Sequence, residues 1–82
     1  KYSDWYDNDH NLICEGDIVK DHNGTGVVKY CPENSEFKVS YGDGTAKWFR
    51  DYTLKNERES IQVVGDMFSI YKLIITIGLK NE

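Results

Sequence analysis

The sequence predicts an all-β domain built as a small five-stranded barrel, with a short N-terminal segment and an apolar C-terminal tail. Apolar Phe37, Val39 and Tyr41 alternate with polar side chains, which is the period of a half-buried strand. Turn-forming stretches at 23–26 and 42–44 contain glycines that tolerate hairpin geometry. Short strands joined by tight turns over about 50 residues are typical of a small barrel of SH3-like type.

The length of the chain bounds its organisation. Its 82 residues are enough for one domain, 1–82, which we divide into a barrel over 12–66 and a tail over 67–82. A domain of this size buries only about 60% of its unfolded surface. Aromatic residues make up 13% of the chain, and such large rings supply buried area to a small core.

Five strands are expected in order along the chain. They cover 16–20, 26–30, 37–41, 45–50 and 61–64. Before them, the Asp- and Asn-rich residues 7–11 predict a turn, after which Leu12-Ile13-Cys14 enters the core. Residues 51–60 are polar and charged, so they are expected to form a loop or one helical turn.

The core should gather the apolar side chains of these strands. The expected members are Ile18, Val28, Val39, Tyr41, Trp48, Ile61 and Val63. Trp48 and Phe49 are adjacent, so one regular strand cannot point both of them inward. One of the two should be exposed, or covered by the N-terminal segment or the tail.

The tail contains the most apolar run of the chain, residues 73–77. This run is too short to cross a bilayer, and no membrane contact is expected. A helical turn is expected near 67–72, with an extended segment after it. The tail either covers a barrel edge of its own chain, or reaches a second copy or forms a surface for the target protein, because an exposed apolar edge invites pairing. We favour a homodimer, with Leu73, Ile75 and Ile77 as the self-association residues.

Charge and cysteine content limit the function classes. The formal net charge of −4 argues against nucleic acid as the main partner, although a local basic patch is compatible with it. Two cysteines are fewer than a secreted domain of this size usually carries. With no apolar leader at the start of the sequence, we expect reduced thiols and an intracellular protein.

No motif predicts a metal, a cofactor or catalysis. Asp7, Asp9 and Asn11 have the opening spacing of a calcium loop, but its glycine and closing glutamate are missing. The cysteines and histidines match no zinc spacing, and a Cys–His nucleophile would lack an orienting third group. Gly24-Thr25-Gly26 lacks the residues of a phosphate loop and is explained by a hairpin turn. No cofactor is expected, and the chain is expected not to be an enzyme.

One cluster is a candidate for partner binding. It comprises Tyr41, Lys47, Trp48, Phe49, Arg50 and Tyr52. Small barrels often present aromatic grooves to peptides, and aromatic residues beside basic ones can also bind single-stranded nucleic acid. The alternative is that most of these rings form the core that a small barrel needs.

Two segments resemble the YopX family of phage and prophage proteins. Residues 6–20, ending in Glu15-Gly16-Asp17-Ile18-Val19-Lys20, are similar to that family's Glu-Gly-Asp-Ile-Val hallmark. Residues 59–68, with Ile61-Gln62-Val63-Val64-Gly65-Asp66, are similar to its closing Ile-Glu-Val-Ile-Gly-Asn segment. The apolar residues 69–82 depart from the family, which usually continues there with an Asn-Pro-Glu-Leu helical stop.

The resemblance implies a barrel fold, a phage or prophage origin and no catalytic residues to carry over. The hypothesis is a non-enzymatic phage accessory protein in the cytoplasm of an infected or lysogenic bacterial host. It would bind a host or phage protein, for example as an anti-CRISPR-type inhibitor of a host defence system. The alternative is a nucleic-acid-binding SH3-like barrel.

Overall fold

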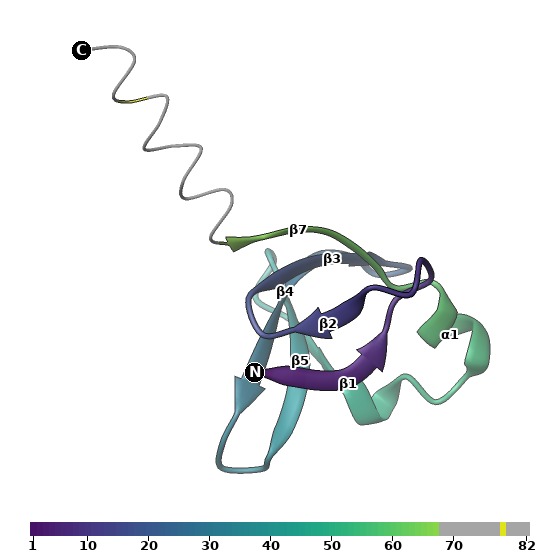
Figure 1. Ribbon diagram of the computed structural model, residues 1–82. Helices are drawn as coiled ribbons and strands as arrows, with labels where there is room; N and C mark the ends of the chain where they lie inside the picture. Colours follow the sequence, from purple (N-terminus) through teal and green to yellow (C-terminus); the bar gives the residue numbers. More distant parts are fainter. Residues whose placement is uncertain (68–77, 79–82) are drawn as a thin grey trace.

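The computed structural model describes residues 1–67 and 78, and these residues are mostly β-strand (Figure 1). The elements in chain order are β1 (Tyr2–Tyr6), β2 (Leu12–Cys14), β3 (Asp17–Asp21), β4 (Gly24–Cys31), β5 (Glu36–Tyr41), β6 (Ala46–Trp48), the 3₁₀ helix η1 (Phe49–Asp51), α1 (Lys55–Glu59) and β7 (Gln62–Asp66). The predicted all-β class is confirmed, and the predicted helical turn within 51–60 is α1.

All five predicted strands pair in one antiparallel sheet of order β6-β5-β4-β3-β7. Strands β3 to β6 follow one another as hairpins, and β7 returns to pair with β3. Among the described residues β6 and β7 are the two edges of this sheet and do not pair with each other, so the sheet is not a closed barrel.

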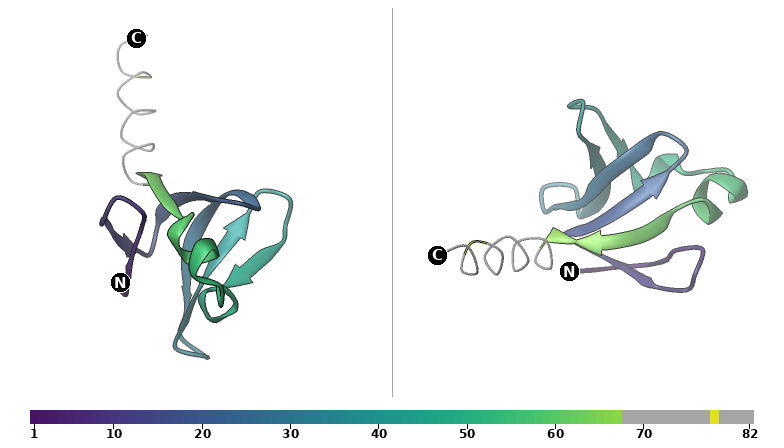
Figure 2. Two further views of the ribbon diagram at one scale, coloured as in Figure 1. Left: turned by 90° about the vertical axis from the view of Figure 1, so that its right-hand side faces the viewer. Right: turned by 90° about the horizontal axis from the view of Figure 1, so that it is seen from above.

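A second, two-stranded sheet lies at the N-terminus. Strands β1 and β2 pair antiparallel around the predicted turn at 7–11. We expected only a short segment before that turn, so β1 was missed. The hairpin lies beside β7 on the side away from β3, as the right-hand view of Figure 2 shows.

The core lies between the inner face of the large sheet and the N-terminal hairpin with η1. Its buried members are Ile13, Val19, Val28, Val39, Phe49, Tyr52 and Ile61. The predictions for Val28, Val39 and Ile61 are confirmed, and Tyr41 and Val63 pack partly buried against the cluster. The predictions for Ile18 and Trp48 were wrong. In each pair of adjacent apolar residues, Ile18-Val19 and Trp48-Phe49, the second member is the buried one.

Strand β6 ends at Trp48, earlier than the predicted end at Arg50. Phe49 begins η1 and turns into the core, where its ring centroid lies 4.7 Å from that of Trp5 and 5.6 Å from that of Phe37. The guanidinium of Arg58 lies over the Trp5 ring, with its Cζ 4.2 Å from the ring centroid. Aromatic contacts therefore attach the hairpin, the large sheet and the α1 segment to one another.

Gly26 of β4 lies against Val39 and Ser40 of β5 with no room for a side chain. A Cβ built on this residue would lie 2.6 Å from Val39 Cγ1 and 2.7 Å from the backbone oxygen of Ser40. Both distances are far inside van der Waals contact, so a side chain here would push β4 and β5 apart. The absence of a side chain lets β3, β4 and β5 pack closely around Val19 and Val39.

Asp7 holds the turn of the N-terminal hairpin. This carboxylate is only 5% exposed, and it accepts hydrogen bonds from the backbone of Asp9 (2.9 Å) and Asn11 (2.7 Å) and from the Asn11 side chain (3.2 Å). It also accepts one from the backbone N–H of Val63 in β7, at 2.9 Å. The calcium-like spacing noted in the sequence thus marks an Asp-centred turn whose carboxylate oxygens are occupied by N–H donors.

Several predictions fall outside the described residues. The helical turn near 67–72 lies there except for Met67, and so do the self-association residues Leu73, Ile75 and Ile77. Within residues 1–67 and 78, no helix is long and apolar enough to span a membrane.

Candidate functional site on the outer face of the sheet

The register of β5 and β6 divides the predicted binding cluster between two faces of the sheet. Val28, Val39 and Lys47 face one another across β4, β5 and β6, and the two valines are buried, so this row points inward. Lys29, Lys38 and Trp48 form the next row and therefore point outward, because side chains alternate along a strand. The six predicted residues therefore do not form one surface.

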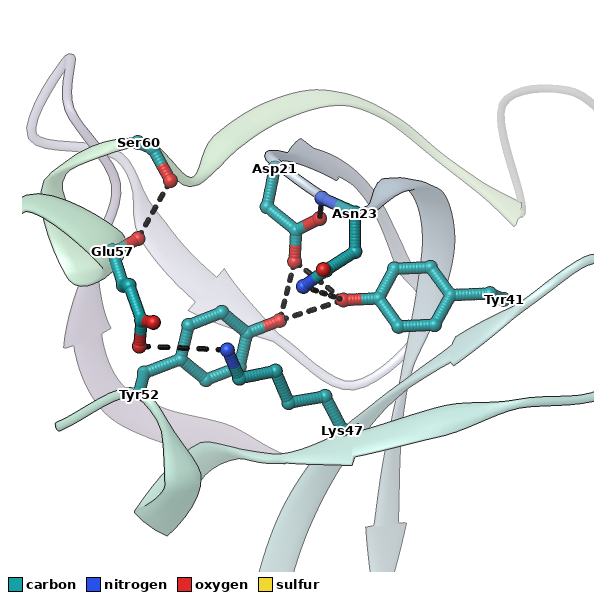
Figure 3. A network of polar contacts seen from close by, with 7 residues as sticks. All are labelled: Asp21, Asn23, Tyr41, Lys47, Tyr52, Glu57 and Ser60. Carbon is teal, nitrogen blue, oxygen red and sulfur yellow. Dashed lines mark hydrogen bonds and ion pairs between the residues drawn. The ribbon is translucent and has the colours of Figure 1, made fainter. Parts of the chain in front are cut away.

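Tyr41 and Tyr52 belong to a polar cluster at the inner side of the sheet (Figure 3). Both hydroxyls donate to Asp21 Oδ2, from Tyr41 at 2.6 Å and from Tyr52 at 2.5 Å, and the two hydroxyl oxygens lie 3.0 Å apart. Burial, together with hydrogen bonding to the Asp21 carboxylate, raises the pKa of both tyrosines. The cluster joins the ends of β3 and β5 to the residue that follows η1.

Lys47 lies over the same cluster. Its Nζ is 4.4 Å from the centroid of the Tyr52 ring and 3.4 Å from Glu57 Oε2 of α1. Phe49 and Tyr52 are buried in the core, and their rings are not offered to a partner. Phe49 and Tyr52 thus belong to the core, which was the alternative to partner binding that the sequence left open.

Trp48 and Arg50 lie on the opposite, outer side with two lysines that the sequence reasoning did not single out. We call this surface the Trp48 face and define it as Lys29, Lys38, Trp48 and Arg50. Lys38 Nζ lies 5.2 Å, and Arg50 Cζ 5.3 Å, from the centroid of the Trp48 ring. Both contacts are within the range of cation–π attraction.

The cations of the Trp48 face differ in how they are compensated. Arg50 Nη1 donates to both carboxylate oxygens of Glu36, at 2.6 and 2.5 Å. Lys29 and Lys38 face each other across β4 and β5. In the described part of the chain, neither lysine forms an ion pair with a carboxylate. The face therefore carries uncompensated positive charge in a chain whose formal net charge is −4.

Lys29 and Lys38 could have been found from strand register. The alternation of residues 37–41 already places Lys38 on the solvent side. The additional information needed was the pairing of Lys29 with Lys38 and of Lys38 with Trp48. That pairing depends on the lengths of two turns, which a single sequence does not determine.

The described surface also has hollows away from the Trp48 face. A groove of about 690 Å³ runs between the N-terminal hairpin and α1 and is lined by Tyr6, Asp7, Asn8, His10, Thr53, Lys55, Arg58 and Glu59. Here Lys55 pairs with Glu59 at 3.7 Å, Asp7 is saturated with N–H donors, and the Arg58 guanidinium lies over the Trp5 ring. A second hollow, of about 380 Å³, lies beside Tyr41 and Lys47.

Potential metal ligands and nucleophiles are dispersed. Cys14 and Cys31 are free thiols on different strands. Among residues 1–67 and 78, no three His, Cys, Asp or Glu side chains are grouped so as to hold a metal ion. The Trp48 face is the candidate site because it combines an outward-facing aromatic ring, two cations against that ring and a further lysine.

Fold and surface together define a small antiparallel β-domain with a mixed aromatic and cationic outer face. Comparison with protein-family models, with curated proteins and with solved structures found no match for this chain.

Proposed function

We propose that this chain is a non-enzymatic binding domain that holds a partner protein on the Trp48 face. The observation that carries the proposal is an outward-facing tryptophan flanked by two cations, Lys38 and Arg50, beside a further uncompensated lysine. Tryptophan and arginine are enriched among the residues that dominate protein–protein binding energy.

The finer fold class belongs to the same proposal. An SH3-like barrel is supported by four consecutive antiparallel strands, a 3₁₀ turn directly after the fourth of them, and pairing of the last strand with β3. Such small barrels are frequent platforms for peptide recognition. The YopX-like segments lie at β2–β3 and β7, where the last strand of the sheet returns to the first.

The origin and location of the partner follow from the YopX resemblance alone. We propose a phage or prophage accessory protein that acts in the cytoplasm of a bacterial host on a host or phage protein. Inhibition of a host defence system is the form of action that such an origin favours. This part of the proposal rests on the family resemblance and on no particular residue of the chain.

Nucleic acid is the second candidate, because lysines beside an aromatic ring are also the elements of single-strand binding. The specific observation in its favour is the row Lys29, Lys38 and Trp48, which crosses three strands. The steepness of the salt dependence separates the two candidates. For nucleic acid, the logarithm of the binding constant falls linearly with the logarithm of the salt concentration, and the slope grows with the number of phosphates that are neutralised.

The test is affinity capture from a nuclease-treated lysate of a bacterial host, with wild-type chain, Trp48→Ala and Tyr6→Ala compared side by side. Tyr6 is a matched control, because it is an exposed aromatic residue on the N-terminal hairpin, away from the Trp48 face. The proposal expects one protein to be captured by wild type and by Tyr6→Ala, and lost with Trp48→Ala. Equal capture by Trp48→Ala would contradict it, provided that its circular dichroism and melting match those of wild type.

A further inference from the structure

The outer face of the large sheet contains two parallel rows of different chemistry. The first is the cationic row Lys29, Lys38 and Trp48. The second lies two residues along each strand and consists of small or apolar side chains, namely Ile18, Val27, Ser40 and Ala46. Positions two apart on a strand are separated by about 7 Å, so the two rows lie side by side.

The lysines of the cationic row have no paired carboxylates among the described residues. Lys29 and Lys38 are directly opposite each other, and like charges in that arrangement destabilise a sheet. Arg50 is neutralised by Glu36, while no carboxylate of the described residues pairs with either lysine. Carboxylates from outside the chain would relieve the repulsion.

The second row offers a shallow surface without charge. Val27 and Ile18 are half-buried apolar side chains, and Ser40 and Ala46 are small enough to leave room above them. An extended chain lying on the sheet projects its side chains alternately to its two sides. One side would meet the lysines, and the other would meet this uncharged row.

We propose that the Trp48 face takes an extended segment of the partner protein in which acidic side chains alternate with apolar ones. This inference rests on the proposed function, whose partner it describes chemically. The carboxylates pair with Lys29 and Lys38 beside Trp48, and the apolar side chains cover Val27, Ser40 and Ala46.

Nucleic acid fits the same surface less well. The face supplies two lysines without acidic partners and so would neutralise few phosphates, although contacts to phosphates supply most of the non-specific affinity for nucleic acid. Bases also need an open aromatic ring on which to stack, and Lys38 and Arg50 both lie over the Trp48 ring. A short acidic segment needs only the charges that this face has.

The inference can be measured through the fluorescence of Trp48. The chain has two tryptophans, so a Trp5→Phe background leaves Trp48 as the single reporter. The probes are a synthetic peptide that alternates glutamate with leucine, the same peptide with glutamine in place of glutamate, and an oligothymidylate. Each probe is titrated into three proteins that all carry Trp5→Phe. The first has no other change, the second also carries Lys29→Glu and Lys38→Glu, and the third, as a control, also carries Lys55→Glu. Lys55 is a solvent-exposed lysine of α1 and not part of the face.

We expect the glutamate peptide to change Trp48 emission and to bind about tenfold more tightly than the glutamine peptide. The double lysine variant should lose this preference, and the Lys55→Glu variant should keep it. Equal binding of both peptides, or tighter binding of the oligothymidylate, would overturn the inference. If lysate capture depends on Trp48 but the peptide preference is absent, only this inference fails. Capture that is independent of Trp48 defeats the proposed function itself.

Discussion

The Asp7 carboxylate accepts the backbone N–H of Val63 at 2.9 Å, across 56 positions of sequence. The neighbouring N–H of Asn8 donates to the carbonyl of Ile61 at 3.0 Å. The turn of the N-terminal hairpin therefore satisfies one backbone group of β7 and one of the residue just before it, as a neighbouring strand would. An edge strand with unsatisfied N–H and C=O groups is a template for unwanted pairing, and this turn covers part of that edge.

Replacing Asp7 with Asn should destabilise the domain. The amide keeps the shape of the side chain, but one carboxylate oxygen becomes a donor and leaves buried N–H groups without an acceptor. The expected loss is about 1–3 kcal/mol in the free energy of unfolding, measured by urea denaturation. Asp9→Asn is the control, because Asp9 is exposed and, within the part of the chain that the structure describes, its carboxylate accepts only a long hydrogen bond of 3.3 Å from Gln62. Equal effects of the two substitutions would show that the link between Asp7 and β7 is unimportant.

The Asp7 contribution should disappear in acid. Burial raises the pKa of this carboxyl, but hydrogen bonds from Val63, Asn11 and Asp9 outweigh that effect and lower it below the ordinary value. A carboxyl with a lowered folded-state pKa adds stability above its unfolded pKa and loses it as the pH falls through the folded one. The difference in unfolding free energy between wild type and Asp7→Asn should therefore be full near neutral pH and shrink below about pH 4. A difference that stayed constant between about pH 7 and about pH 2 would contradict this assignment.

Tyr52→Phe tests the polar cluster at Asp21. The substitution removes a hydroxyl that donates to the Asp21 carboxylate and leaves the packing of the ring intact. A loss of about 1–3 kcal/mol in unfolding free energy is expected, since a hydrogen bond to a charged group is lost inside the protein. Tyr6→Phe removes an exposed hydroxyl for comparison and should change stability by less than about 0.5 kcal/mol. The cluster has no stabilising role if Tyr52→Phe melts with the wild-type midpoint.

The tail prediction stands on the sequence alone. Leu73, Ile75 and Ile77 form an apolar run without charge, and a small domain gains much from an added apolar interface. Deleting residues 73–82 should shift the mass measured by analytical ultracentrifugation from dimer toward monomer. Sedimentation of the full chain as a monomer at every accessible concentration would refute the homodimer.

Several elements of the fold were accessible from the sequence for physical reasons. The alternation at 37–41 has the period of a strand with one buried face, and it is β5. Turn residues bounded the other strands of the large sheet. Strand β1 was missed because its inward side chains are Ser3 and Trp5, which do not form an apolar alternation; Ser3 Oγ instead donates to the carbonyl of Ile13 at 2.7 Å.

The faces of the strands were harder to predict than their positions. Where two apolar residues are adjacent, as in Ile18-Val19 and Trp48-Phe49, composition cannot tell which one is inside. Pairing of Val19 with Gly26 and of Trp48 with Lys38 decides the matter, and pairing depends on turn geometry. For the same reason the predicted binding cluster combined residues of both faces, while Lys29 and Lys38 went unnoticed.

The most direct test of the central claim is the affinity of the captured partner for a charge-reversed Trp48 face. Once the partner has been purified, its dissociation constant is measured by isothermal titration calorimetry against wild type, Lys38→Glu and the control Lys55→Glu. Our account predicts that Lys38→Glu weakens binding by about tenfold or more, while Lys55→Glu leaves the dissociation constant within about twofold of wild type. Equal dissociation constants for wild type and Lys38→Glu would contradict the account.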